Sequence, residues 1–274
     1  MNHMALRDGR QGVHGAERKL MVWGILVGVI IIGGTILATL GAYSFMRRVT
    51  GGDPEGVDRD LASSVVFRIS ALHGLILALV FAQEMFQYEQ LKYASATEAD
   101  AVADVYFDAG RYDPLAKLPI QKALGEYARL VIEEEWPALA TERRLSQAAW
   151  NQWDAAYQAV LDLAPANKRQ ESLRDHMLQQ VHVISQQRIQ REATVGDSIN
   201  GIFWVAALSG VVFIALAYYP YQPDRRSLML IAMFGAYTGI ILFFIYAFSD
   251  PYRPPAELSP GAFVRLQQQI AISG

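Results

Sequence analysis

The chain has 274 residues, of which 52% are hydrophobic and 19% charged, and its formal net charge is −3. This composition is too polar for a protein made only of membrane helices, so we expect one membrane part and one water-exposed part. The absence of cysteine excludes disulfides, thiolate catalysis and cysteine-bound metals. Between Gln83 and Asn200, 18 acidic side chains outnumber 12 basic ones, which disfavours nucleic acid as a partner because phosphate binding needs a basic face.

The first apolar run predicts a membrane anchor. Residues 1–19 are polar and rich in glycine, and we expect them to form a disordered arm. Residues 20–43 are nearly uncharged and would form about 36 Å of helix, enough to cross the hydrocarbon core. A signal peptide is the alternative, but its apolar core would be only about 7 to 15 residues long. Gly24 and Gly28 are spaced for close helix packing.

A second crossing is predicted at residues 64–83, after a turn-rich loop at 47–60. Arg68 lies about one turn inside this crossing and is predicted to anchor it by reaching the headgroups. No glycine or proline interrupts the helical pattern where the crossing ends. We therefore expect the same helix to continue from lipid into the water-exposed part.

His73 lies deep in the second crossing, where an ionisable side chain usually faces a bundle interior or a wet cavity. Helical spacing places it on one face with three later residues. We interpret this face as a set of pore-lining or gating candidates, namely His73, Ile76, Val80 and Glu84. The alternative is that His73 only hydrogen-bonds a neighbouring helix.

Residues 84–198 are predicted to form a helical insert of four or five antiparallel helices. Turns are expected at Asp113-Pro114 and Ala164-Pro165, and a helix end at Trp136-Pro137. The acidic run Glu133, Glu134 and Glu135 is a weak metal candidate, with a solvated face as the alternative. No catalytic or nucleotide-binding motif is present, so we expect neither an enzyme nor a cofactor.

Two further crossings are predicted at residues 199–220 and 227–248. Asp197 and Asn200 precede the third crossing and could join Glu84 in a ring of oxygen-bearing side chains at a pore mouth, although interface polarity alone would give the same pattern. Gly235 and Gly239 in the fourth crossing are spaced for close helix packing.

The C-terminal segment, residues 250–274, contains Ser259-Pro260, a pair typical of a helix start. The helix that follows has an apolar face and is predicted to lie on the membrane or on the insert. Four crossings would put both termini and the insert on one side. Nine basic residues near that side against five on the other favour a cytoplasmic insert.

Several stretches resemble one family in their order and spacing. HGLILALVFA in the second crossing, YARLVIEEEWP in the insert and the closing DPYRPPAELSPGAF are similar to the bacterial bestrophin-like membrane proteins, a domain of unknown function. The resemblance covers roughly residues 20–272, and the matching positions are Gly74, Glu98, Trp136, Asp250 and Pro251. It implies an oligomeric ion channel of the bacterial cytoplasmic membrane, whose second crossing lines the pore and whose insert continues the conduit.

The sequence therefore predicts an all-α, polytopic membrane protein with four transmembrane helices and a long helical insert between the second and third. The function we expect is ion conduction by a homo-oligomer, with lipid, other copies of the chain and inorganic ions as partners. The acidic insert would concentrate cations. The alternative is a non-conducting scaffold or sensor whose insert binds a protein partner. A membrane enzyme or metal transporter would instead need carboxylates and histidines converging on one cavity.

Overall fold

The computed structural model describes residues 5–51, 59–196 and 201–273. Over these ranges the secondary structure is helical and contains no strand, as the sequence predicts. The chain divides into two compact units. We call Met1–Phe86 with Ile199–Ala256 the membrane unit, and Gln87–Ser198 with Glu257–Gly274 the insert unit.

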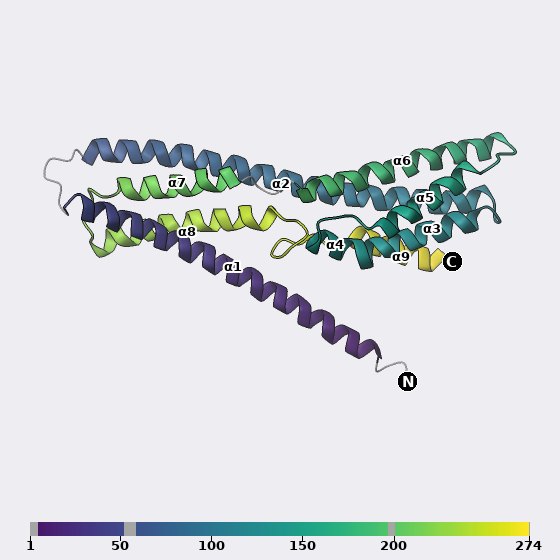
Figure 1. Cartoon of the computed structure of the whole chain (residues 1–274), viewed down its shortest axis with the longest axis horizontal. Coiled ribbons are helices and arrows are strands. Elements are labelled where there is room, and N and C mark those ends of the chain that lie inside the picture. The colour runs from purple at the N-terminus through teal and green to yellow at the C-terminus, as the bar shows by residue number, and fades with distance from the viewer. Residues whose placement is uncertain (1–4, 52–58, 197–200, 274) are drawn as a thin grey trace. The chain divides into compact units, whose positions relative to one another are not determined.

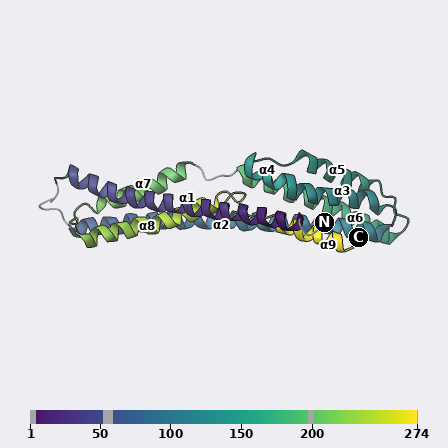
Figure 2. The same cartoon turned by 90° about the horizontal axis from the view of Figure 1, so that it is seen from below.

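The membrane unit contains α1 (Ala5–Val49), the first part of α2 (Arg59–Tyr112), α7 (Gly201–Ala217) and α8 (Arg225–Phe248). Within the described residues, α1, α2 and α8 are long and apolar enough to cross a membrane. Helix α7 is equally apolar, but its 17 residues span only about 26 Å. Figure 1 and Figure 2 show α7 and α8 alongside the C-terminal part of α1.

Helix α1 extends beyond the predicted crossing at both ends. It begins at Ala5, so the expectation of a disordered arm over residues 1–19 is wrong for residues 5–19. This stretch contains no proline, and extending an existing helix by one residue costs far less than starting a new one. At the other end α1 includes Arg47 and Arg48, and the chain turns at Gly51, whose φ of 81° suits glycine.

Glycines bring α1 and α8 into backbone contact. A Cβ placed on Gly239 would lie 2.8 Å from Cα of Ile32, and one on Gly235 would lie 2.5 Å from Oγ1 of Thr39. Gly24 and Gly28 similarly face Pro255 and Phe243. All four glycines chosen from their spacing thus serve close packing within one chain, which leaves them covered from other copies.

Helix α2 runs without a break for 54 residues, from Arg59 to Tyr112. The helix therefore does not end where the predicted crossing ends at residue 83. Its first part belongs to the membrane unit and its last part to the insert unit.

The insert unit combines the end of α2 with α3 (Lys117–Leu130), the π-helical segment η1 (Val131–Glu135), α4 (Trp136–Thr141), α5 (Gln147–Leu161), α6 (Lys168–Gly196) and α9 (Gly261–Ser273). Helix α5 packs against α3 and α6 (Figure 1). The apolar residues Ile120, Leu124, Tyr127 and Val131 recur at intervals of three and four residues and are buried.

Two further sequence predictions concern residues of the insert unit. The expected helix end at Trp136-Pro137 is wrong, because η1 leads directly into α4 and Pro137 fits in the first turn of α4, where a proline is tolerated. The C-terminal helix α9 packs on α3 with Phe263 and Leu266 buried, so the structure places it on the insert.

Candidate conduit helix and buried charge cluster

His73 of α2 is seated directly on Gly210 of α7. A Cβ on Gly210 would lie 2.1 Å from His73 Nδ1 and 2.7 Å from Cε1, so only glycine leaves room for the ring at this position. The side chain is 5% exposed, and its Nε2 has no hydrogen-bond partner among the described residues. A buried ring nitrogen without a partner is costly in an apolar setting, which marks His73 as an unusual position.

The other predicted pore candidates lie mostly on the same covered face. Glu84 is 5% exposed, and Val80 packs on a core of Leu77, Ala207, Leu242 and Ile245. Ile76 is 44% exposed and lies at the edge of this face. Asp197 and Asn200 lie outside the described residues. In the single chain, the predicted pore face is thus mainly the face by which α2 packs on its own neighbours.

The opposite face of α2 is uncovered within the chain. At about 100° per residue, Leu75 points almost directly away from His73. Leu75 and Leu79 are 57% and 63% exposed. The same face carries four further small exposed residues and one exposed cation, namely Ala71, Gly74, Ala78, Ala82 and Arg68. A Cβ on Gly74 would meet no atom within 4 Å. This uncovered face is the one that another molecule can reach.

A cluster of four buried charges lies inside the insert unit. Arg191 binds both oxygens of Glu98, with Nε to Oε2 at 2.7 Å and NH2 to Oε1 at 2.9 Å, and its NH2 also contacts Glu135 Oε1 at 2.7 Å. Arg188 pairs with Glu135 as well and donates to the carbonyl of Ser146 at 2.8 Å. All four charged side chains are fully buried. Two cations and two anions balance, so the cluster carries no net charge for a ligand.

Aromatic side chains enclose this cluster. The Tyr127 hydroxyl donates to Glu98 and accepts from Arg188 NH1 at 3.2 Å. The Arg188 guanidinium lies 4.7 Å from the Trp150 ring centre, and that of Arg191 lies 5.3 Å from Trp136. Trp136 Nε1 donates to the carbonyl of Leu258 at 2.7 Å. The predicted family positions Glu98 and Trp136 are therefore both part of the insert core.

The electrostatics of the cluster keep Arg191 and Tyr127 protonated. Burial alone lowers the pKa of Arg191, but the charges of Glu98 and Glu135 outweigh it and hold that pKa well above its ordinary value. Burial raises the pKa of Tyr127, and the neighbouring Glu98 charge adds to the effect. Both groups stay protonated through the physiological pH range, so we interpret the cluster as a structural contact within the insert unit.

Glu135, the last residue of the π-helical segment η1, reaches the cluster. Helical spacing from Leu124 and Val131 places it on the same buried face as those residues. Glu135 points inward, while Glu133 and Glu134 stay exposed and Glu133 pairs with Arg129. The three carboxylates therefore do not converge, and the described residues contain no group of three or more acidic, histidine or cysteine side chains suited to a metal.

Sequence reasoning missed Arg188 and Arg191 as core residues and counted both among the cations near the bilayer. Their spacing held the missing signal. They continue the stripe of buried Met177, Val181 and Ile184 on α6 at intervals of three and four residues. An arginine on a buried stripe requires a buried carboxylate partner.

The remaining predicted positions lie near the end of the membrane unit. Asp250 Oδ2 lies 3.6 Å from Arg253 Nε, and its Oδ1 accepts from the backbone N–H of Tyr252 at 3.4 Å. Pro251 and Tyr252 are buried. These contacts shape the turn after α8.

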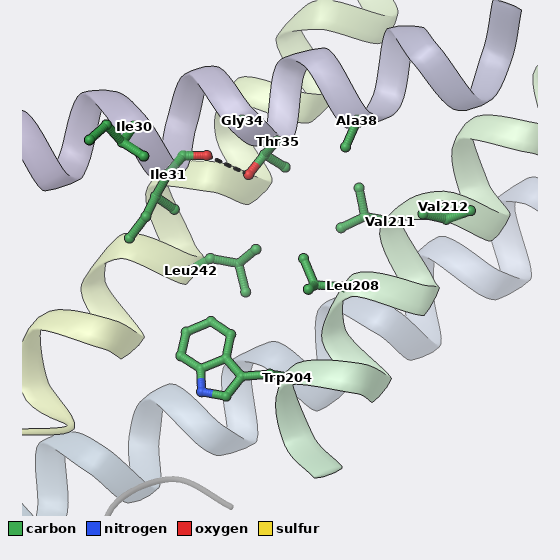
Figure 3. Close-up of a pocket in the computed structure, with 10 residues that line it drawn as sticks. All are labelled: Ile30, Ile31, Gly34, Thr35, Ala38, Trp204, Leu208, Val211, Val212 and Leu242. Atoms are coloured by element: carbon green, nitrogen blue, oxygen red, sulfur yellow. Dashed lines mark hydrogen bonds between the residues drawn. The ribbon is translucent and has the colours of Figure 1, made fainter. Parts of the chain in front are cut away.

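A pocket of about 440 Å³ lies between α1, α7 and α8 (Figure 3). Its one hydroxyl, on Thr35, donates to the carbonyl of Ile31 at 2.7 Å. The lining is otherwise mostly aliphatic, with Ile30, Ile31, Gly34, Thr35, Ala38, Trp204, Leu208, Val211, Val212 and Leu242. No ionisable side chain lines the pocket, so it offers no group that would bind an ion.

Comparisons with known proteins agree with this architecture. The profile of the bestrophin-like domain matches residues 33–263. A bacterial bestrophin homologue from Klebsiella pneumoniae, solved as a point mutant, has the same fold with a TM-score of 0.67 at 11% identity, over 90% of this chain and 99% of its own. A mutated membrane protein of known structure gives a TM-score of 0.67 at 10% identity, over 89% and 97%. No curated protein sequence matches the chain.

Proposed function

The chain belongs to the bestrophin-like domain family, and from this premise we propose that it forms an oligomeric ion channel whose conduit is lined by α2. The observation that carries the proposal is the division of α2 into two faces. The face with His73 packs inside the chain, while the face with Leu75 and Leu79 is uncovered. Copies arranged around an axis with this face inward would form rings of leucine, and apolar rings of this kind gate pores by dewetting.

Of the pore candidates from the sequence, Ile76 can border this conduit, because it is partly exposed. His73, Val80 and Glu84 would not line the conduit; they would fix the position of α2 on its neighbours. Arg68, predicted as a headgroup anchor, shares the uncovered face with Leu75, so in this arrangement it would face the conduit at one end of the crossing. Asp197 and Asn200 remain candidates for the pore mouth.

We propose that the permeant ions are cations. The insert carries 18 acidic against 12 basic side chains, and on α2 both Asp100 and Asp104 are exposed. A surface with excess negative charge raises the local concentration of cations and lowers that of anions. The charge of the insert therefore favours cation entry.

The membrane arrangement follows from the same proposal. Helix α7 serves as the third crossing and α8 as the fourth, and both termini and the insert lie in the cytoplasm of a bacterial cell, at its inner membrane. Because Gly24, Gly28, Gly235 and Gly239 are covered within the chain, contacts between copies must use other surfaces. The open glycines Gly33, Gly34 and Gly41 on α1, with Gly74 on α2, permit a close approach.

Ion flux through liposomes that contain the purified protein tests the proposal. Leu79→Ala widens the proposed constriction and should raise flux by about tenfold, equivalent to about 1.4 kcal/mol of barrier. Leu37→Ala is the matched control, because Leu37 is an exposed leucine of α1. Equal flux for the two variants contradicts a conduit along this face of α2. No flux of any inorganic ion, over a range of pH, calcium and voltage, contradicts conduction itself.

The cation preference is tested in the same liposomes by comparing sodium or potassium flux with chloride flux. Replacing Asp100 and Asp104 by asparagine should lower the ratio of cation to anion flux. Asp154→Asn with Asp175→Asn removes two exposed charges from α5 and α6 and is the control. A ratio that falls equally in both double variants would mean that the total charge, rather than the α2 face, sets the preference.

A scaffold or sensor is the second candidate function. Leu115, in the turn between α2 and α3, is 81% exposed, and Leu118, at the start of α3, is 61% exposed, although both belong to the insert unit. Exposed large apolar side chains outside the membrane are typical of docking surfaces for protein partners. If the protein gives no flux, Leu115→Ser with Leu118→Ser should abolish the binding of such a partner.

A further inference from the structure

We propose that the contact between His73 and Gly210 is a proton-sensitive joint between α2 and α7 that controls conduction. This inference deepens the proposed channel function and rests on it. It starts from the seat of the imidazole ring, whose Nδ1 would lie 2.1 Å from a Cβ on Gly210. The ring thus occupies the space that a side chain at residue 210 would need, and the two helices are in close contact at this point.

The buried site of the His73 ring disfavours a charged ring. Nε2 of His73 is buried and has no partner among the described residues, so the neutral ring already leaves one polar atom unsatisfied there. A protonated ring would add a positive charge at the same place. An isolated charge in an apolar interior is strongly unfavourable, so the protonated ring has to leave the seat or gain water.

The surroundings of the ring offer no counter-charge. Helix α7, which forms the seat, has no titratable side chain between Gly201 and Ala217. On α2 the nearest ionisable side chains are Arg68, five residues earlier, and Glu84, eleven residues later. At about 1.5 Å per residue, these lie roughly 8 Å and 16 Å away along the axis. The described parts of α1 between Val22 and Met46 and of α8 between Ser227 and Phe248 add no charged group.

The direction of the movement follows from the two faces of α2. His73 faces α7, and Leu75 faces almost the opposite way. A protonated His73 that breaks its contact with Gly210 displaces α2 away from α7, toward the side on which Leu75 and Leu79 are uncovered. In the proposed assembly this side is the conduit. Acidification should therefore narrow the leucine constriction and lower ion flux.

Flux measured in liposomes in steps from about pH 7.5 to about pH 4 tests the joint. We expect the wild-type flux to fall roughly tenfold on acidification. His73→Gln keeps a polar side chain of similar size that does not titrate, and its flux should change much less. An equal fall in His73→Gln would overturn the proposal.

A double-variant cycle tests the contact between His73 and Gly210. Gly210→Ala introduces a methyl group where the ring lies, so it should lower flux at neutral pH as protonation does. His73→Ala removes the ring and makes room for that methyl group. The double variant His73→Ala with Gly210→Ala should therefore conduct like His73→Ala alone. Independent, additive losses from the two changes would show that the contact does not set the position of α2.

A structural measurement separates failure of the joint from failure of the channel. The chain contains no cysteine, so Phe67→Cys on α2 and Val205→Cys on α7 allow spin labels at two exposed sites only. The distance between the labels should increase on acidification, and this increase should vanish in His73→Gln. If the distance changes while no variant conducts, the joint stands and the channel function fails. A distance that is independent of pH overturns the joint.

Discussion

Arg191 on α6 binds Glu98 on α2 by two parallel contacts of 2.7 and 2.9 Å, with both side chains fully buried. Two-pronged contacts between a guanidinium and a carboxylate fix both the distance and the orientation of the groups. The contact joins residues 93 positions apart in the chain. It therefore holds α6 in one register along α2 within the insert unit.

Arg191→Met should destabilise the insert unit strongly. The substitution leaves Glu98 and Glu135 with fewer cationic partners in a buried site, and breaking a buried ion pair costs about 3–5 kcal/mol. Hydrogen exchange of the α6 backbone amides in the full-length protein measures this loss, because it reports the stability of one region separately.

The control for this variant is Arg129→Met, which removes an arginine from the half-exposed pairs with Glu126 and Glu133. Exposed pairs contribute little, so exchange should stay close to that of the wild type. Similar exchange in Arg191→Met and Arg129→Met would contradict the role given to the buried cluster.

Tyr127 should make the insert unit sensitive to alkaline pH. Burial and the Glu98 charge raise the pKa of Tyr127 above its unfolded value of about 10, so its contribution to stability is complete below that value. Above it the unfolded chain releases a proton that the folded chain retains, and the free energy of unfolding falls by about 1.4 kcal/mol per pH unit.

Tyr127→Phe removes this proton, so the free energy of unfolding should decline less steeply above about pH 10 than in the wild type. Hydrogen exchange of α3 and α6 at several alkaline pH values compares the two slopes. The variant should also be less stable near neutral pH, because Glu98 and Arg188 lose a hydrogen-bond partner. Identical slopes would show that Tyr127 titrates equally in the folded and unfolded chains.

The long apolar helices and the amphipathic stripes of the insert could be predicted because they depend on local periodicity. The stripe from Ile120 to Val131 is buried as its spacing indicates. The unbroken α2 followed from the absence of glycine and proline near residue 83. These features need no knowledge of tertiary contacts.

What could not be predicted depends on which partner meets each face. Periodicity places His73 and Glu84 on one side of α2, but it gives no indication whether that side meets α7 or a conduit. The π-helical segment over VIEEE is indicated by no propensity scale. The packing glycines were recognised from their spacing, yet only coordinates show that their partners lie in the same chain.

Gly239→Ala should weaken the contact between α1 and α8 in the membrane unit. The added methyl group would lie 2.8 Å from the backbone Cα of Ile32, and a backbone atom cannot move aside as a flexible side chain can. The two helices must separate, and overpacking of this kind costs about 1–3 kcal/mol. Thermal unfolding in detergent, followed by the loss of helical circular dichroism, should show a lower Tm. Gly125→Ala on α3 is the control, because its methyl group would meet no atom within 4 Å and the proposed contacts between copies do not use it. Its Tm should equal or slightly exceed that of the wild type, since alanine favours helix over glycine. If both alanine variants lowered the Tm equally, the close contact of Gly239 with Ile32 would not be a source of stability.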